Sequence, residues 1–146
     1  MSELENAIKI MSDGEYTCVM CSGEAVYTST ERGVKPLLAA LASGQELRGA
    51  SAADKVVGRA AAFLYVLIGV SRVYAEVMSE TAISVFERYG VEHSCRERTQ
   101  TVYNRTLTGL CPMESAVLDI TQPEEAKTAI EKKLAELRAA NSAPKK

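Results

Sequence analysis

A strand, helix, strand pattern in the middle of the chain restricts the fold more than any other feature. The segment SRVYAEVM at 71–78 favours a strand, SETAISVFERYG at 79–90 has the spacing of an amphipathic helix, and VEHSC at 91–95 favours another strand. Two strands joined through a helix by short links pair in parallel with a right-handed crossover. The pattern therefore predicts an α/β core, with a sheet that carries helices on both faces.

The first half of the chain adds elements to this core. ELENAIKIMSDG at 3–14 predicts a short helix, EYTCVMC and AVYTS predict a β-hairpin around a Ser-Gly-Glu turn, and GVKPLLAALASG at 33–44 predicts a second helix. We expect 51–68 to be one long helix, with Ser51 as its cap and Asp54 completing a capping box. From Val56 onward this segment is apolar nearly all round, which is typical of a buried helix.

The second half ends in helices. RERTQTVYNR at 96–105 predicts a polar edge strand, and GLCPMESAVLDI at 109–120 predicts a helix that Cys111 caps, with Glu114 folding back on the amide of the cap. In the last helix, over 123–140, the apolar stripe of Ala126, Ile130, Leu134 and Leu137 would either cover the sheet or meet a second subunit. We expect one domain over residues 1–140 and a disordered tail over 141–146.

Composition excludes several classes of function. The 146 residues include 17 basic and 19 acidic side chains, for a formal net charge of −2, so nothing recommends nucleic acid or an anionic membrane as a partner. The longest apolar run, at 60–70, is too short to cross about 30 Å of hydrocarbon. The first residues are acidic where a signal peptide is basic, and the four cysteines are expected to be thiols. These features predict a cytoplasmic protein.

Cysteine and histidine do not have the spacing of a metal site. Cys18 and Cys21 form a CxxC motif inside a predicted strand, where their odd offset directs the two side chains to opposite faces. His93 and Cys95 share a strand face, but no second pair with ligand spacing accompanies them, and zinc needs three or four ligands. We therefore expect no metal and no cofactor.

Three predicted helix starts are polar, namely those at 51–55, 79–81 and 111–114. Free amides and the helix dipole make such starts natural sites for phosphate or carboxylate groups. At the third start the dipole would favour the thiolate of Cys111 and make it more reactive, although a purely structural cap explains the same residues. Glu76, near the carboxyl end of a strand, and Arg59, in a buried helix, need partners, and an internal ion pair would satisfy them. Glu76 is also a site candidate, since open α/β sheets bind ligands at this end.

Four stretches carry a resemblance to a known family: ERGVKPLLAAL, GASAADKVVGRAAA, VYAEVMSE and TGLCPMESAVLDI. Together they resemble a small bacterial and archaeal family of unknown function whose fold is similar to that of cytidine deaminases, over about Thr17 to Ile130. The resemblance implies a three-layer mixed sheet opened by a β-hairpin, with a site between two helix N-termini. Active zinc deaminases carry His or Cys with Glu at one such helix and Pro-Cys-x-x-Cys at the other. SAADKVVG and MSETA lack these ligands, so zinc-dependent deamination is disfavoured.

Two functions remain from different classes, and a third is structural. The first is a binding protein for a small nucleotide-like or anionic metabolite at converging helix N-termini. Its candidate residues share polar side chains near predicted helix starts and strand ends: Ser51, Asp54, Lys55, Glu76, Ser79, Glu80 and Asn104. The second is an enzyme with Cys111 as nucleophile and Glu114 or Asp54 as proton carrier. The third is a subunit of a homo-oligomer joined through the C-terminal helix.

Overall fold

A five-stranded mixed sheet forms the centre of the protein. The computed structural model describes residues 2–31, 33–100 and 111–142. The strands lie in the order β2-β1-β3-β4-β5, with bounds β1 Cys18–Ser22, β2 Ala25–Ser29, β3 Ser51–Val57, β4 Arg72–Ser79 and β5 Glu92–Thr99. β1 is antiparallel to β2 and β3, whereas β3, β4 and β5 are parallel. This confirms the predicted mixed α/β sheet opened by a hairpin.

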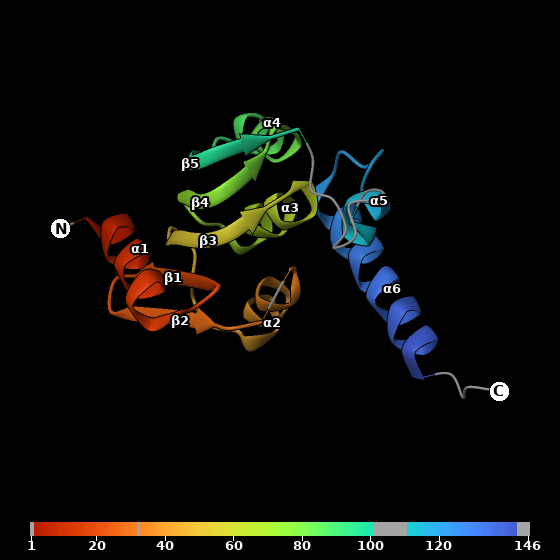
Figure 1. Cartoon of the computed structure of the whole chain (residues 1–146), viewed down its shortest axis with the longest axis horizontal. Helices are drawn as coiled ribbons and strands as arrows, with labels where there is room; N and C mark the ends of the chain where they lie inside the picture. The colour runs from red at the N-terminus through yellow and green to blue at the C-terminus, as the bar shows by residue number, and fades with distance from the viewer. Residues whose placement is uncertain (1, 32, 101–110, 143–146) are drawn as a thin grey trace.

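Helices cover both faces of the sheet, as predicted (Figure 1). The larger core lies on the face that carries three helices: α2 Lys35–Ser43, α3 Arg59–Ile68 and α4 Glu80–Tyr89. A smaller core lies on the opposite face, under α1 Glu3–Gly14. Cys18 belongs to the larger core and Cys21 to the smaller one, which confirms that the two thiols of the CxxC motif face opposite sides. Across the described residues, no helix is both long and apolar enough to span a membrane.

The predicted long helix over 51–68 is wrong in its first half. Ser51–Val57 is the central strand β3, and α3 begins only after Gly58. The alanines of this segment favour a helix in isolation, but β3 is flanked by β1 and β4, and its first four residues are buried on both faces. Ala52 packs in the larger core and Ala53 in the smaller one, where small side chains let the covering helices approach the sheet. Tertiary packing therefore overrides local propensity here.

The last third of the chain also differs from the expectation. β5 continues without a break to Thr99, so it includes the start of the predicted separate edge strand, and the rest of that strand lies outside the described residues. The helix predicted over 109–120 is only α5, Pro112–Ala116. α6, Pro123–Ser142, packs against α3, and its residues Ala126 and Ile130 are fully buried. The apolar stripe of α6 therefore packs chiefly on α3 rather than on the sheet.

Candidate functional site

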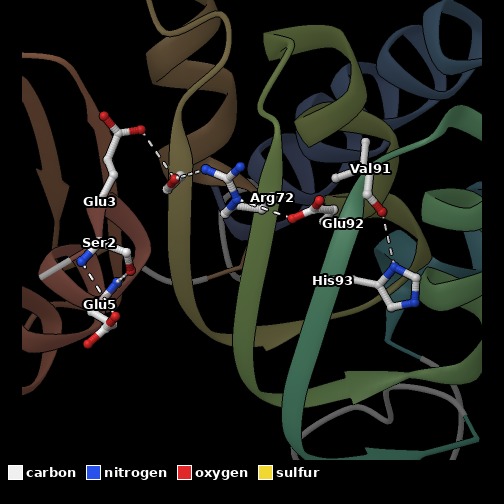
Figure 2. Close-up of polar contacts among 8 residues, drawn as sticks. Ser2, Glu3, Glu5, Arg72, Val91, Glu92 and His93 are labelled. Carbon is white, nitrogen blue, oxygen red and sulfur yellow. Dashed lines mark hydrogen bonds and ion pairs between the residues drawn. The ribbon is translucent and has the colours of Figure 1, made fainter.

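Ser51 lies at the amino edge of the parallel strands, away from the helix starts. Its hydroxyl donates to Glu3 Oε1 at 3.2 Å and accepts from Arg72 Nη1 at 3.0 Å. Arg72 Nε in turn donates to Glu92 Oε2 at 3.3 Å, so these contacts join α1, β3, β4 and β5 (Figure 2). The predicted role of Ser51 as a helix cap is wrong, and its position here is that of a structural link.

Asp54 is enclosed in the larger core. The hydroxyl of Tyr65, on α3, donates to Asp54 Oδ2 at 2.6 Å, and the same hydroxyl lies 3.4 Å from Cys18 Sγ. Burial raises the pKa of Asp54 to about 7, while hydrogen bonds from Tyr65 and from the amides of Lys55 and Val56 oppose the shift. Burial also raises the pKa of the Cys18 thiol. The predicted capping box is wrong, because Asp54 belongs to a hydrogen-bonded network that joins β1, β3 and α3.

Lys55 and Glu76 form an ion pair between β3 and β4. Lys55 Nζ lies 3.1 Å from Glu76 Oε2, and the two side chains are 42% and 38% exposed. Glu76 has an ion-pair partner, as expected, but the expectation that the pair is internal is wrong, because both side chains are half-exposed. Arg59 is not part of it, since its guanidinium binds carbonyl groups instead.

The start of α4 is formed as the sequence predicts. Ser79 is the N-cap, and its hydroxyl accepts from the amide of Ala82 at 3.0 Å and lies 2.9 Å from Thr81 Oγ1. Glu80 follows in the first turn and is exposed. Ser79 is fully buried, so its side chain serves α4 itself. The remaining candidate of this set, Asn104, lies outside the described residues.

Glu114 completes the start of α3, a role that the sequence did not reveal. Its two carboxylate oxygens accept from the amides of Arg59 at 2.7 Å and Ala60 at 2.8 Å. The residue is 5% exposed, and burial raises its pKa although these amides and the Arg59 charge lower it. The predicted capping box with Cys111 is wrong, because α5 has no side-chain cap bond. The N-cap of α3 is Gly58, which has no side chain to accept a hydrogen bond. This glycine was the sequence signal that the first amides of α3 need an acceptor from another element.

A crevice opens between α3, α4 and the segment that leads into α6. Its volume is about 150 Å³. The lining residues divide into an apolar floor of Phe63, Val85 and Tyr89 and a polar rim of Arg59, Ser84, Arg88 and Thr121. Four of the seven lining residues are polar or charged, so the crevice is more polar than most small-molecule sites. Sequence reasoning singled out Arg59 among these residues, but as a member of an ion pair.

Backbone carbonyls hold the guanidinium of Arg59 in place. Arg59 Nε donates to the carbonyl of Val117 at 3.3 Å, and Arg59 Nη2 donates to that of Ile120 at 2.5 Å. The guanidinium carbon lies 4.9 Å from the centroid of the Phe63 ring, within cation–π range. Arginine has five N–H donors, and the other three have no acceptor among the described residues.

Arg88 provides the second positive charge of the crevice. Its guanidinium carbon lies 5.8 Å from the centroid of the Tyr89 ring, and the hydroxyl of Tyr89 donates to the carbonyl of Thr121 at 2.8 Å. Within the described residues, neither Arg59 nor Arg88 forms an ion pair with a carboxylate. The crevice thus combines two guanidinium groups with an aromatic floor.

No group of three or more His, Cys, Asp or Glu side chains with metal-binding geometry occurs in the described ranges. His93 stacks on Phe86 with ring centroids 5.9 Å apart, and its Nδ1 lies 3.1 Å from the carbonyl of Val91. Cys95 is half-buried beside the larger core. These contacts account for both residues as packing elements of β5.

The chain matches the model of a family described as a domain of unknown function, DUF1893, over residues 6–134. The chain belongs to the DUF1893 family. It is similar to the crystal structure of a DUF1893 family protein from Thermotoga maritima, with a TM-score of 0.81 and 28% identity over 92% of this chain and 89% of that chain. This likeness extends the observed fold to another DUF1893 member, and the family description assigns no reaction. No curated protein matches the chain.

A second solved structure is much less similar. It is a diaminohydroxyphosphoribosylaminopyrimidine deaminase/5-amino-6-(5-phosphoribosylamino)uracil reductase from Thermotoga maritima, with a TM-score of 0.43 and 13% identity. The match covers 94% of this chain and 41% of that chain. The strand order and pairing define the sheet of this chain without reference to that match.

Proposed function

We propose that this DUF1893 protein binds a small anion, and that the binding site is the crevice between α3 and α4. The observation that carries the proposal is the pair of guanidinium groups, from Arg59 and Arg88, at one hollow without an ion-pair partner among the described residues, although the charge of Arg59 also acts on Glu114. Two arginines that lack such a partner attract a carboxylate or phosphate, and each can donate more than one hydrogen bond to it.

The crevice suits the anionic ligand class better than the helix starts do. The amides at the start of α3 already bind Glu114, and Ser79 caps α4. The volume of about 150 Å³ is below the roughly 300 Å³ at which pockets begin to enclose drug-sized ligands. This size favours a small anion over a nucleotide-like molecule.

The geometry gives less support to the nucleophile hypothesis. Both oxygens of Glu114 are engaged by α3, and Asp54 is bonded to Tyr65 inside the core. Neither carboxylate is therefore placed to exchange protons with Cys111, which caps a helix of five residues. Alkylation of Cys111 at neutral pH no faster than that of an ordinary thiol would agree with a non-catalytic role.

Isothermal titration calorimetry of the full chain with inorganic phosphate and with acetate tests the proposal. We expect saturable binding that Arg88→Gln weakens about tenfold or more, because a charge-assisted contact of about 1.5–3 kcal/mol is lost. The control is Arg48→Gln, which removes the same charge from an exposed arginine just before β3 that does not line the crevice. Equal affinities for the two variants, or no saturable binding of any anion, would contradict the proposal.

A further inference from the structure

We infer that the anion of the crevice regulates how firmly the C-terminal part of the chain docks on α3 and α4. This inference rests on the proposed function, and it adds a regulatory role for the same site. The C-terminal unit consists of α5, α6 and the segment 117–122 that connects them. Thr121 of this unit forms one wall of the crevice, while α3 and α4 supply the other lining residues. The anion would therefore lie at the boundary between the unit and the two helices.

Two residues that line the crevice also hold the unit in place. Arg59 donates to the carbonyls of Val117 and Ile120, at 3.3 and 2.5 Å. Tyr89 donates to the carbonyl of Thr121 at 2.8 Å. All three acceptors are backbone groups of the connecting segment, so the docking of the unit and the geometry of the crevice depend on the same contacts.

The rest of the unit has few buried side chains. The buried residues among 112–139 are Met113, Glu114, Val117, Ala126 and Ile130. The second half of α6 extends beyond the other elements of the molecule (Figure 1). Segments with few buried apolar side chains open at a lower free energy than the core of a protein. We therefore expect the unit to undock without unfolding of the sheet.

Docking orients the donors that the anion needs. The guanidinium group is planar and rigid, so the two hydrogen bonds from Nε and Nη2 of Arg59 also fix the direction of Nη1. When the unit undocks, both carbonyl acceptors are lost and the side chain recovers its rotamer freedom. An anion that binds the undocked state must order this side chain again, which lowers its affinity. The anion therefore prefers the docked state and shifts the population toward it.

The size of the effect follows from this preference. An anion that binds only the docked state multiplies the docking equilibrium constant by a factor that is about tenfold at ten times its Kd. Amide hydrogens that exchange through undocking slow by the same factor, whereas those of elements that stay in place keep their rates.

Hydrogen–deuterium exchange of the full chain, with and without inorganic phosphate at constant ionic strength, tests the inference. The phosphate concentration is set to about ten times the Kd obtained by calorimetry. We expect the amides of α6 to exchange about tenfold more slowly with phosphate, while those of the hairpin β1–β2, at the far edge of the sheet from β5, keep their rates. Equal slowing in both elements, or no slowing in α6, would overturn the inference.

Tyr89→Phe weakens the docking contact itself. The Tyr89 hydroxyl has one hydrogen, which it donates to Thr121, and phenylalanine keeps the ring beside Arg88, so the anion loses no donor. We expect α6 to exchange about fivefold faster in this variant, and phosphate to slow it again. The matched control is Tyr27→Phe, which removes a hydrogen bond of the same kind, to the carbonyl of Pro36 at 2.7 Å, and should not change the exchange of α6. Identical α6 rates in wild type and Tyr89→Phe would overturn the inference.

The proposed function and this inference fail in different ways. Phosphate that binds in an Arg88-dependent manner without slowing the exchange of α6 would leave the small-anion site standing and refute the regulation of docking. The slowing should be lost in Arg88→Gln, and slowing that persists there would refute the inference, because the effect would come from another site. If no anion of any kind depends on Arg88, both are refuted.

Discussion

Glu114 satisfies two backbone donors that α3 cannot satisfy from its own sequence. The cap of α3 is Gly58, which has no side chain to accept a hydrogen bond, so the amides of Arg59 and Ala60 need an acceptor from another element. The carboxylate also lies at the positive end of the helix dipole. Glu114 therefore ties α5 to α3 beside the crevice, since the side chain of Arg59 forms part of the rim.

Replacement of Glu114 should measure the strength of this tie. We expect Glu114→Ala to lower the free energy of unfolding by about 1–3 kcal/mol, because two buried amides lose their acceptor. The matched control is Glu87→Ala, at an exposed position in the last turn of α4, which should change it by less than about 0.5 kcal/mol. Urea denaturation of both variants measures the difference. Equal stabilities would mean that the capping contact contributes nothing.

Asp54 makes the stability of the protein depend on pH. Its folded pKa of about 7 lies above its ordinary value of 3.8, because burial disfavours the charged carboxylate. The folded state then holds a proton that the unfolded chain has released, so this contribution is complete below about pH 4 and is lost as the pH rises to about 7. The wild-type protein should therefore lose stability relative to Asp54→Asn across this window.

Urea denaturation of both proteins at several pH values from about 4 to about 8 measures this loss, with a limiting slope of about 1.4 kcal/mol per pH unit for one proton. The control is Asp13→Asn, which removes an exposed carboxylate from α1 and should keep the wild-type slope. Parallel curves for wild type and Asp54→Asn would show that Asp54 is not protonated in the folded state.

At the scale of the elements, the sequence predicted the order of β1, β2, α2, β4 and α4 and missed β3. Elements with a clear period or a strong cap, such as α4 with Ser79 and Gly90, carry their own signal. β3 has no such signal, because its first four residues are buried on both faces and show no alternation, and its alanines suit a helix when read alone. What decides its structure is the packing of Ala53 under α1, which only the folded chain contains.

Enlargement of Ala53 should therefore disturb the contact between β3 and α1. Ala53 is fully buried in the smaller core with Ala7, so we expect Ala53→Leu to lower the free energy of unfolding by about 1–3 kcal/mol through overpacking. Val56→Leu is the control on the same strand, since Val56 is 46% exposed and has room for the added carbon. Thermal unfolding followed by circular dichroism compares the two. An unchanged midpoint for Ala53→Leu would contradict this account of β3.

At the scale of the whole molecule, the sequence predicted the polar residues of interest but not their neighbours. Ser51, Asp54 and Ser79 were expected around one pocket, yet the structure puts them at the amino edge, in the core and at the start of α4. Their positions follow from the correction of β3, because a strand of seven residues separates its ends whereas a helix start would gather them. The crevice has no local signal, since Arg59 and Arg88 come together only when α3 packs beside α4.

α6 is the last helix in chain order. Its apolar stripe can contribute to the core of one chain or form a contact between two copies of the chain. Ile130 is fully buried against the larger core, while Leu137 farther along the same stripe is only partly buried. We expect Ile130→Ala to lower the free energy of unfolding by about 2–5 kcal/mol through the cavity it leaves, and Leu137→Ala to lower it by less.

The same variants test whether α6 joins two copies of the chain. If α6 acts only within one chain, the urea midpoint of each protein will not change between low and high protein concentration. A midpoint that rises with protein concentration, and a rise that Leu137→Ala abolishes, would instead show that the stripe joins two copies, because association stabilises only the assembled state by mass action.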